Sequence, residues 1–173
     1  MIVVLFKKKG FTIAEFLLLM IVSGFLILIS ISFFIQAKEK ATQKSTMADI
    51  KMWGEAIDCY ISDYSVAPTN PRGTMNYKKP IVKELSPYLE AIRIVDWWGH
   101  PLWIWTGKDC RQYGISTESE HDFIISSLGR EGDPDGWKYD PRNSDSGFFK
   151  IKNFEDFKND LVMWNNKFIR CPR

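Results

Sequence analysis

One acidic residue, Glu15, stands at the start of an otherwise uncharged apolar segment. Residues 16–35 contain no charged side chain. At about 1.5 Å per residue, a helix of that length spans the roughly 30 Å hydrocarbon core of a bilayer. A carboxylate costs on the order of 2.5–3.5 kcal/mol at the centre of a membrane helix and less near an interface. A plain membrane anchor would not offset that cost, so Glu15 is expected to have a partner.

The residues before Glu15 narrow the possible roles of the apolar segment. Lysines at 7–9 are followed by Gly10, Phe11 and Thr12. Positive charge beside a membrane helix favours the cytoplasmic side, so the N-terminus is expected to stay there while the rest crosses. A cleaved secretory signal should have an apolar region of about 7–15 residues that ends in a small-x-small site. This run is longer, which leaves a signal anchor or a segment with a further function.

Basic residues, Gly10, Phe11, Thr12, Glu15 and a long apolar run, in that order, resemble the processing site of the type IV pilin superfamily. That superfamily includes the pseudopilins of type II secretion. The resemblance implies that a prepilin peptidase removes leader residues 1–10 and methylates the new N-terminal residue, Phe11. In a filament, the new amine would meet the Glu15 carboxylate of a neighbouring subunit, so two charges that are each costly alone form one pair. Residues 11–35 would then be the transmembrane and filament-core helix.

An amphipathic pattern follows the apolar run. Between Met47 and Tyr64, apolar residues recur at spacings of three and four, which is typical of one helix face packed on a core. Gly54 interrupts the pattern at a cost of up to ~1 kcal/mol relative to Ala. Pro68 is expected to follow the end of the helix. The sequence therefore predicts a single helix over about 12–66, whose second part, 36–67, continues onto a globular head at 68–173.

The head is expected to be α+β, with the long N-terminal helix packed on a small antiparallel sheet. Alternating apolar residues and turn signals predict its elements. Asn165 and Asn166 tolerate the positive φ of a type I′ turn and predict a closing hairpin. In chain order, the expected elements are a short helix at 81–92, interrupted or started by Pro87, and strands at 102–106, 122–127, 161–164 and 167–170.

Three segments of the head resemble the major pseudopilin of type II secretion: the turn at 96–101, the segment 127–132 and the closing hairpin. The resemblance implies a structural subunit of a helical pseudopilus that drives protein export. Its partners would be other copies, minor pseudopilins and the inner-membrane assembly platform, with the head in the periplasm. Two alternatives stay open: a type IV pilin or minor pilin for adhesion, competence or motility, and a signal-anchored periplasmic binding domain.

In the major pseudopilins, the loop after the second of these segments binds one calcium ion. Calcium takes six to eight oxygen ligands from carboxylates, carbonyls and water. The resemblance therefore implies a calcium site in the loop 129–147, and the alternative is a solvated acidic turn region. The candidate ligands are the Leu128 carbonyl and the carboxylates of Asp133, Asp135, Asp140 and Asp145.

Composition excludes several other functions. The net charge of +2 comes from the lysines at 7–9, so the head has no basic excess to neutralise phosphates, and no nucleic-acid partner is expected. No G-x-S-x-G, phosphate-loop or H-E-x-x-H motif occurs, which favours a structural protein over an enzyme.

Aromatic residues and cysteines carry weaker signals. The tryptophans at 97, 98, 103 and 105 could form a sugar-stacking platform, but buried packing is the favoured interpretation. Cys59 lies beside the helical stripe and is expected to be buried. A disulfide, if one forms, has most freedom between Cys110 and Cys171.

Overall fold

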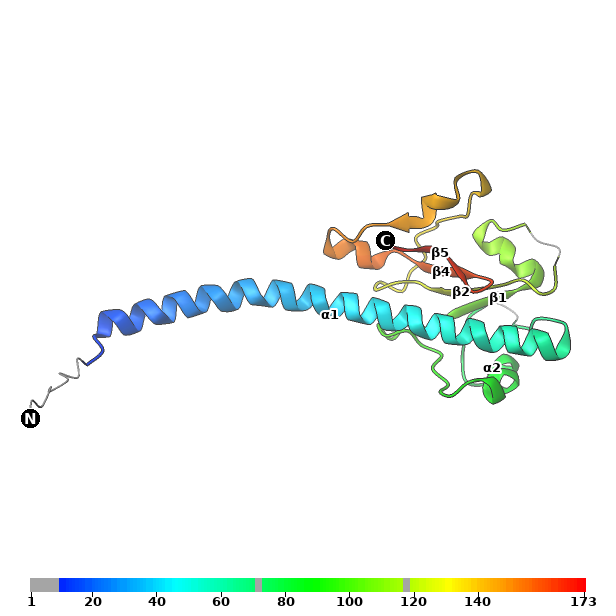
Figure 1. Ribbon diagram of the computed structural model, residues 1–173, viewed down its shortest axis with the longest axis horizontal. Coiled ribbons are helices and arrows are strands. Elements are labelled where there is room, and N and C mark those ends of the chain that lie inside the picture. The colour runs from blue at the N-terminus through cyan, green and yellow to red at the C-terminus, as the bar shows by residue number, and fades with distance from the viewer. Residues whose placement is uncertain (1–9, 71–72, 117–118) are drawn as a thin grey trace, which may run out of the picture. The chain divides into compact units, whose positions relative to one another are not determined.

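The computed structural model describes residues 10–70, 73–116 and 119–173 (Figure 1). The chain divides into two compact units, with the boundary between Lys38 and Glu39. The leader predicted at 1–10 lies outside the described residues, apart from Gly10.

A single long helix, α1 (Ile13–Tyr64), confirms the helix predicted over 12–66. In the first unit its apolar side chains are exposed, from Phe16 at 58% to Ile35 at 42%. Within the described residues, α1 is the one helix long and apolar enough to cross a membrane. An apolar surface of that extent is stable in lipid rather than in water.

The second unit joins the last part of α1 to a five-stranded sheet in the order β1-β2-β4-β5-β3 (Figure 1). The remaining elements are α2 (Pro80–Leu85), β1 (Trp103–Thr106), β2 (Phe123–Ser127), β3 (Phe148–Phe149), β4 (Leu161–Trp164) and β5 (Lys167–Pro172), with 3₁₀ helices at Ser86–Tyr88, Gly107–Tyr113, Pro141–Gly147 and Phe154–Lys158. The α+β class and four predicted strands are confirmed.

One prediction for the head was wrong in detail, and the structure decides between two alternatives for another. The sheet is mixed, because the short β3 pairs with β5 in parallel. The helix predicted at 81–92 is interrupted near Pro87, which was one of the two alternatives: α2 ends at Leu85 and a 3₁₀ turn, Ser86–Tyr88, follows. Pro87 lacks the N–H that a continued α-helix would need, which explains this early end.

The closing hairpin has the predicted turn. Trp164 pairs with Lys167, and Asn165 and Asn166 adopt φ values of 44° and 60°. Both values lie in the left-handed region that a type I′ turn requires. Gly54 of α1 lies against this turn, where a Cβ would overlap the side chains of Asn166 and Met163. The glycine therefore lets the helix and the hairpin approach closely, which offsets its low helix propensity.

Alternate residues of the strands enter two separate clusters. Ile50, Trp53 and Ile57 of α1 are fully buried in the larger cluster, together with Ile104 and Ile125 of the sheet. The smaller cluster contains Ile124, Val162 and Ile169, with Cys110 and Tyr113 from the 3₁₀ helix after β1. The predicted apolar stripe of α1 is thus core packing from Met47 to Ile61, as expected, whereas its last member, Tyr64, is 61% exposed.

Candidate functional site

The first candidate site is the start of α1, where Thr12 and Glu15 form a capping box. The backbone N–H and the hydroxyl of Thr12 both donate to Glu15 Oε2 at 2.8 Å, and the Glu15 N–H lies 3.3 Å from Thr12 Oγ1. Such a reciprocal pair satisfies donors that an α-helix leaves open at its N-terminus. The Thr-x-x-Glu spacing is visible in the sequence, but only an intermolecular role was predicted for Glu15.

The residues around the predicted cut are accessible. Gly10 and Phe11 are exposed, and nothing lies within 4 Å of a Cβ built at Gly10. A peptidase could therefore approach this backbone closely. Cleavage after Gly10, methylation of Phe11 and pairing of Glu15 with a neighbouring amine all remain predictions.

Two serines in the apolar half of α1 bond to the carbonyls of the helix itself. Ser23 Oγ donates to the Met20 carbonyl at 3.0 Å, and Ser30 Oγ donates to the Leu26 carbonyl at 2.7 Å. Such bonds remove the cost of an unpaired hydroxyl in lipid. Glu15 is then the group in this half whose charge calls for a partner.

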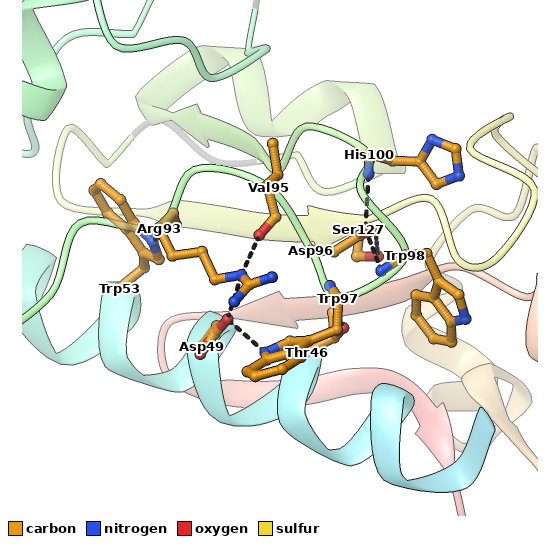
Figure 2. A network of polar contacts seen from close by, with 10 residues as sticks. All are labelled: Thr46, Asp49, Trp53, Arg93, Val95, Asp96, Trp97, Trp98, His100 and Ser127. Atoms are coloured by element: carbon orange, nitrogen blue, oxygen red, sulfur yellow. Dashed lines mark hydrogen bonds and ion pairs between the residues drawn. The ribbon is translucent and has the colours of Figure 1, made fainter. Parts of the chain in front are cut away.

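A second candidate site is the turn at 96–101, which is built around a fully buried aspartate (Figure 2). Asp96 Oδ1 accepts the N–H groups of Trp98 at 3.0 Å and His100 at 2.9 Å, and Oδ2 accepts the Ser127 hydroxyl at 2.7 Å. Both oxygens are therefore occupied, which is the condition for burying a carboxylate at acceptable cost.

The same turn is attached to α1. The Trp97 N–H donates to Thr46 Oγ1 at 3.1 Å, and its indole N–H donates to Asp49 at 2.9 Å. Arg93 stacks 4.1 Å above the Trp97 ring and lies 3.6 Å from the Asp49 carboxylate (Figure 2). Partial burial raises the pKa of Asp49, while Trp97 and Arg93 oppose that rise.

Segment 127–132 meets this turn directly. Ser127 Oγ, the partner of Asp96, also accepts the Gly129 N–H at 3.2 Å. His100 Nε2 lies 3.1 Å from the Arg130 carbonyl. Gly132, at φ 76°, faces the His100 ring, and a Cβ there would lie 2.5 Å from Nδ1. Two segments that each resemble pseudopilins are therefore parts of one structure, which their separate motifs did not predict.

Both segments also converge on Glu39 of α1. The Trp98 indole N–H donates to one of its oxygens at 2.7 Å, and Arg130 lies 3.8 Å from the other. We call this set the helix anchor: Glu39, Asp49, residues 96–100, Ser127 and Arg130. It connects α1 to the sheet, so its role is positional rather than chemical.

The aspartates proposed as calcium ligands do not converge. Asp133 is exposed, Asp140 caps a 3₁₀ helix through the Arg142 N–H at 2.9 Å, and Asp145 pairs with Arg173 at 3.2 Å. Asp135 instead contacts Arg170. Leu128 is buried, next to Ser127 at the end of β2.

No group of three or more acidic, histidine or cysteine side chains that could hold a metal ion occurs within the described residues. These residues, as placed, do not fit a calcium ligand set. Calcium binding remains a prediction.

The structure identifies two residues beside the loop 129–147 that were not predicted as site residues, Asp160 and Arg170. Asp160 is 1% exposed, and burial, together with the charge of Asp135, raises its pKa to about 7. Arg170 is 9% exposed. Arg170 could have been noticed in the sequence, because it is a charged residue within the otherwise apolar pattern of β5.

The predictions for tryptophan and cysteine need correction. The four tryptophans do not form one buried cluster: Trp97 is 48% exposed, whereas Trp103 and Trp105 stack at 5.8 Å on β1. Cys59 is exposed rather than buried, because it lies off the buried face of α1. Cys110 and Cys171 are free thiols in separate core clusters, and burial raises the pKa of Cys110 to about 12.

Comparison with known proteins gives one informative match. The type II secretion system core protein G of Vibrio cholerae serotype O1 is 28% identical over 154 residues, which cover 86% of this chain and 97% of the relative. No family model matches the chain. No solved structure matches it significantly.

The apolar N-terminal helix and the small mixed-sheet head are consistent with a pilin-like α+β fold. The match extends over nearly the whole relative and confirms the resemblance to the type IV pilin superfamily. Within that class, the similarity is to the major pseudopilin of type II secretion systems.

Proposed function

We propose that this chain is a structural subunit of a type II secretion pseudopilus. The observation that carries the proposal is the match to core protein G, which includes 97% of that pseudopilin. The exposed apolar half of α1 supports storage in a membrane, and the capping-box acid at its start supports a specialised helix terminus.

The proposed cycle begins in the inner membrane, with the N-terminus cytoplasmic and the head periplasmic. Prepilin peptidase removes residues 1–10, and Phe11 becomes the methylated N-terminus. Glu15 then exchanges its bonds to Thr12 for the amine of Phe11 on a neighbouring subunit, which neutralises both charges in a medium of low dielectric.

The work of the protein is mechanical, so it is a substrate of the peptidase and not itself an enzyme. Copies of the chain, minor pseudopilins and the assembly platform are its proposed partners. The helix anchor would transmit force between α1 and the head, because it joins the two through the carboxylates of Glu39 and Asp49.

Cleavage tests the proposal. The full chain is coexpressed with a prepilin peptidase and its intact mass is measured, beside Gly10→Val and the matched control Gly24→Val. The wild type and Gly24→Val should lose residues 1–10, and Gly10→Val should stay uncut, because a side chain at Gly10 blocks the close approach. An uncut wild type, or equal cleavage of all three, would contradict the pilin-like assignment and favour a signal-anchored domain.

A further inference from the structure

Two carboxylates meet at the base of the loop 129–147, which we call the acidic loop: Asp135 within the loop and Asp160 just before β4. The Asp160 N–H donates to Asp135 Oδ2 at 3.2 Å, which brings the two side chains into electrostatic contact. Asp160 is almost fully buried, and its Oδ1 has no hydrogen-bond partner among the described residues. A buried, unpartnered carboxylate oxygen is costly, and a like charge beside it adds to that cost.

Arg170 of β5 supplies positive charge at this point. Its Nη2 contacts Asp135 Oδ2 and donates to Asn159 Oδ1 at 3.0 Å. The side chain is only 10% exposed, and its guanidinium lies 5.3 Å from the Trp137 ring and 5.6 Å from the Phe149 ring. Its charge also lowers the pKa of Asp160, against the effect of burial.

We propose that the Arg170 guanidinium is a built-in cation that organises the acidic loop in place of a metal ion, and that its removal opens a latent site for a divalent cation at Asp135 and Asp160. This inference does not depend on the proposed function, since it concerns only the folded head.

The chemistry favours arginine over calcium in this chain. One nitrogen of the guanidinium, Nη2, reaches both the Asp135 carboxylate and the Asn159 amide oxygen, although Nε is buried without a partner among the described residues. Calcium would instead require six to eight oxygens. The other aspartates of the loop are used elsewhere or exposed. Without Arg170, the site would hold two adjacent carboxylates and the Asn159 amide oxygen, a set of hard oxygens that attracts a divalent cation.

The test measures the melting temperature of the full chain in non-ionic detergent, by near-ultraviolet circular dichroism, with millimolar calcium chloride or excess chelator. The wild type should melt at the same temperature in both. Arg170→Met keeps much of the volume and removes the charge, and it should melt about 10 °C lower in chelator. Calcium should return several degrees of that loss, because it binds only the folded state. Magnesium should return less, because it demands a tighter octahedral geometry.

Arg173→Met is the matched control, because Arg173 also pairs with a loop aspartate and stacks on an aromatic ring, but at the exposed surface. It should show no calcium response. A calcium-dependent rise for the wild type would overturn the first half of the proposal. A folded Arg170→Met without any calcium response would overturn the second half.

If Arg170→Met does not fold in either buffer, a double variant with Asp160→Asn decides the question. It removes the excess negative charge together with the arginine, so it should fold and should not respond to calcium. Failure of the double variant to fold would mean that Arg170 acts through packing alone, and the proposal would be wrong.

Discussion

Two buried aspartates of the same head have opposite surroundings. Asp96, in the helix anchor, has both oxygens paired with three nearby donors. Asp160, at the base of the acidic loop, keeps one unpaired oxygen and lies beside a second carboxylate. The contrast indicates that the turn at 96–101 is held on the end of β2 by completed hydrogen bonds. The loop depends instead on the charge of one arginine and should be more sensitive to its conditions.

The largest expected loss of stability comes from removing the Asp96 carboxylate, whose two oxygens are both paired. Asp96→Ala leaves three donors without this acceptor, the buried Ser127 hydroxyl and the half-buried N–H groups of Trp98 and His100, and should lower the free energy of unfolding by about 3 kcal/mol. Urea unfolding of the full chain in detergent measures this. Asp133→Ala, at an exposed aspartate, should stay within about 0.5 kcal/mol of the wild type. Equal losses for the two variants would remove the distinction between a structural and a solvated carboxylate.

Close packing between α1 and the closing hairpin should be nearly as sensitive. Gly54→Val would overlap the side chains of Asn166 and Met163 in the closing hairpin, so we expect a loss of about 2 kcal/mol. The adjacent exposed position gives the control, since Glu55→Val tests the β-branched side chain in α1 without the overlap. If Gly54→Val is as stable as the wild type or more stable, the higher helix propensity of valine outweighs the overlap, and contact with the hairpin does not explain the glycine.

The smallest expected effect is a pH dependence of stability due to Asp160, and it tests the charge balance at the base of the acidic loop most directly. The raised pKa of Asp160, about 7, means that the folded state binds more protons than the unfolded state between roughly pH 4 and pH 7. Stability contributed by this group therefore falls as the pH rises through that window. Asp160→Asn should be about 1–2 kcal/mol more stable than the wild type at pH 8 and close to it at pH 4.

Urea unfolding at the two pH values measures this difference. A difference between variant and wild type that is the same at both pH values would show that Asp160 does not titrate as described.

Periodicity and turn chemistry were enough to predict α1, four strands and the Asn165-Asn166 turn. Those features depend on neighbours in the chain. The two-residue β3 carries too little pattern to predict, and its parallel pairing depends on where the chain returns.

Contacts between residues that are distant in the sequence could not be predicted either. Nothing local shows that Ser127 bonds Asp96, or that Arg170 lies beside Asp135. The aspartates of the loop looked like a ligand set because composition does not show that Asp140 caps a helix and Asp145 pairs with Arg173.

The central claim is that the chain builds a pseudopilus needed for protein export, and export itself is the most direct measurement. The gene is deleted in its host and restored as wild type, Gly10→Val or Glu15→Val, and the proteins in the medium are quantified by mass spectrometry. Deletion should leave exported proteins inside the cell, and the wild type should restore them. Gly10→Val should stay uncut and should not restore export. Glu15→Val should be cut but should also not restore export. Export that continues at the wild-type level without the gene would contradict the account, and loss of surface pili in the same cells would identify a type IV pilin instead.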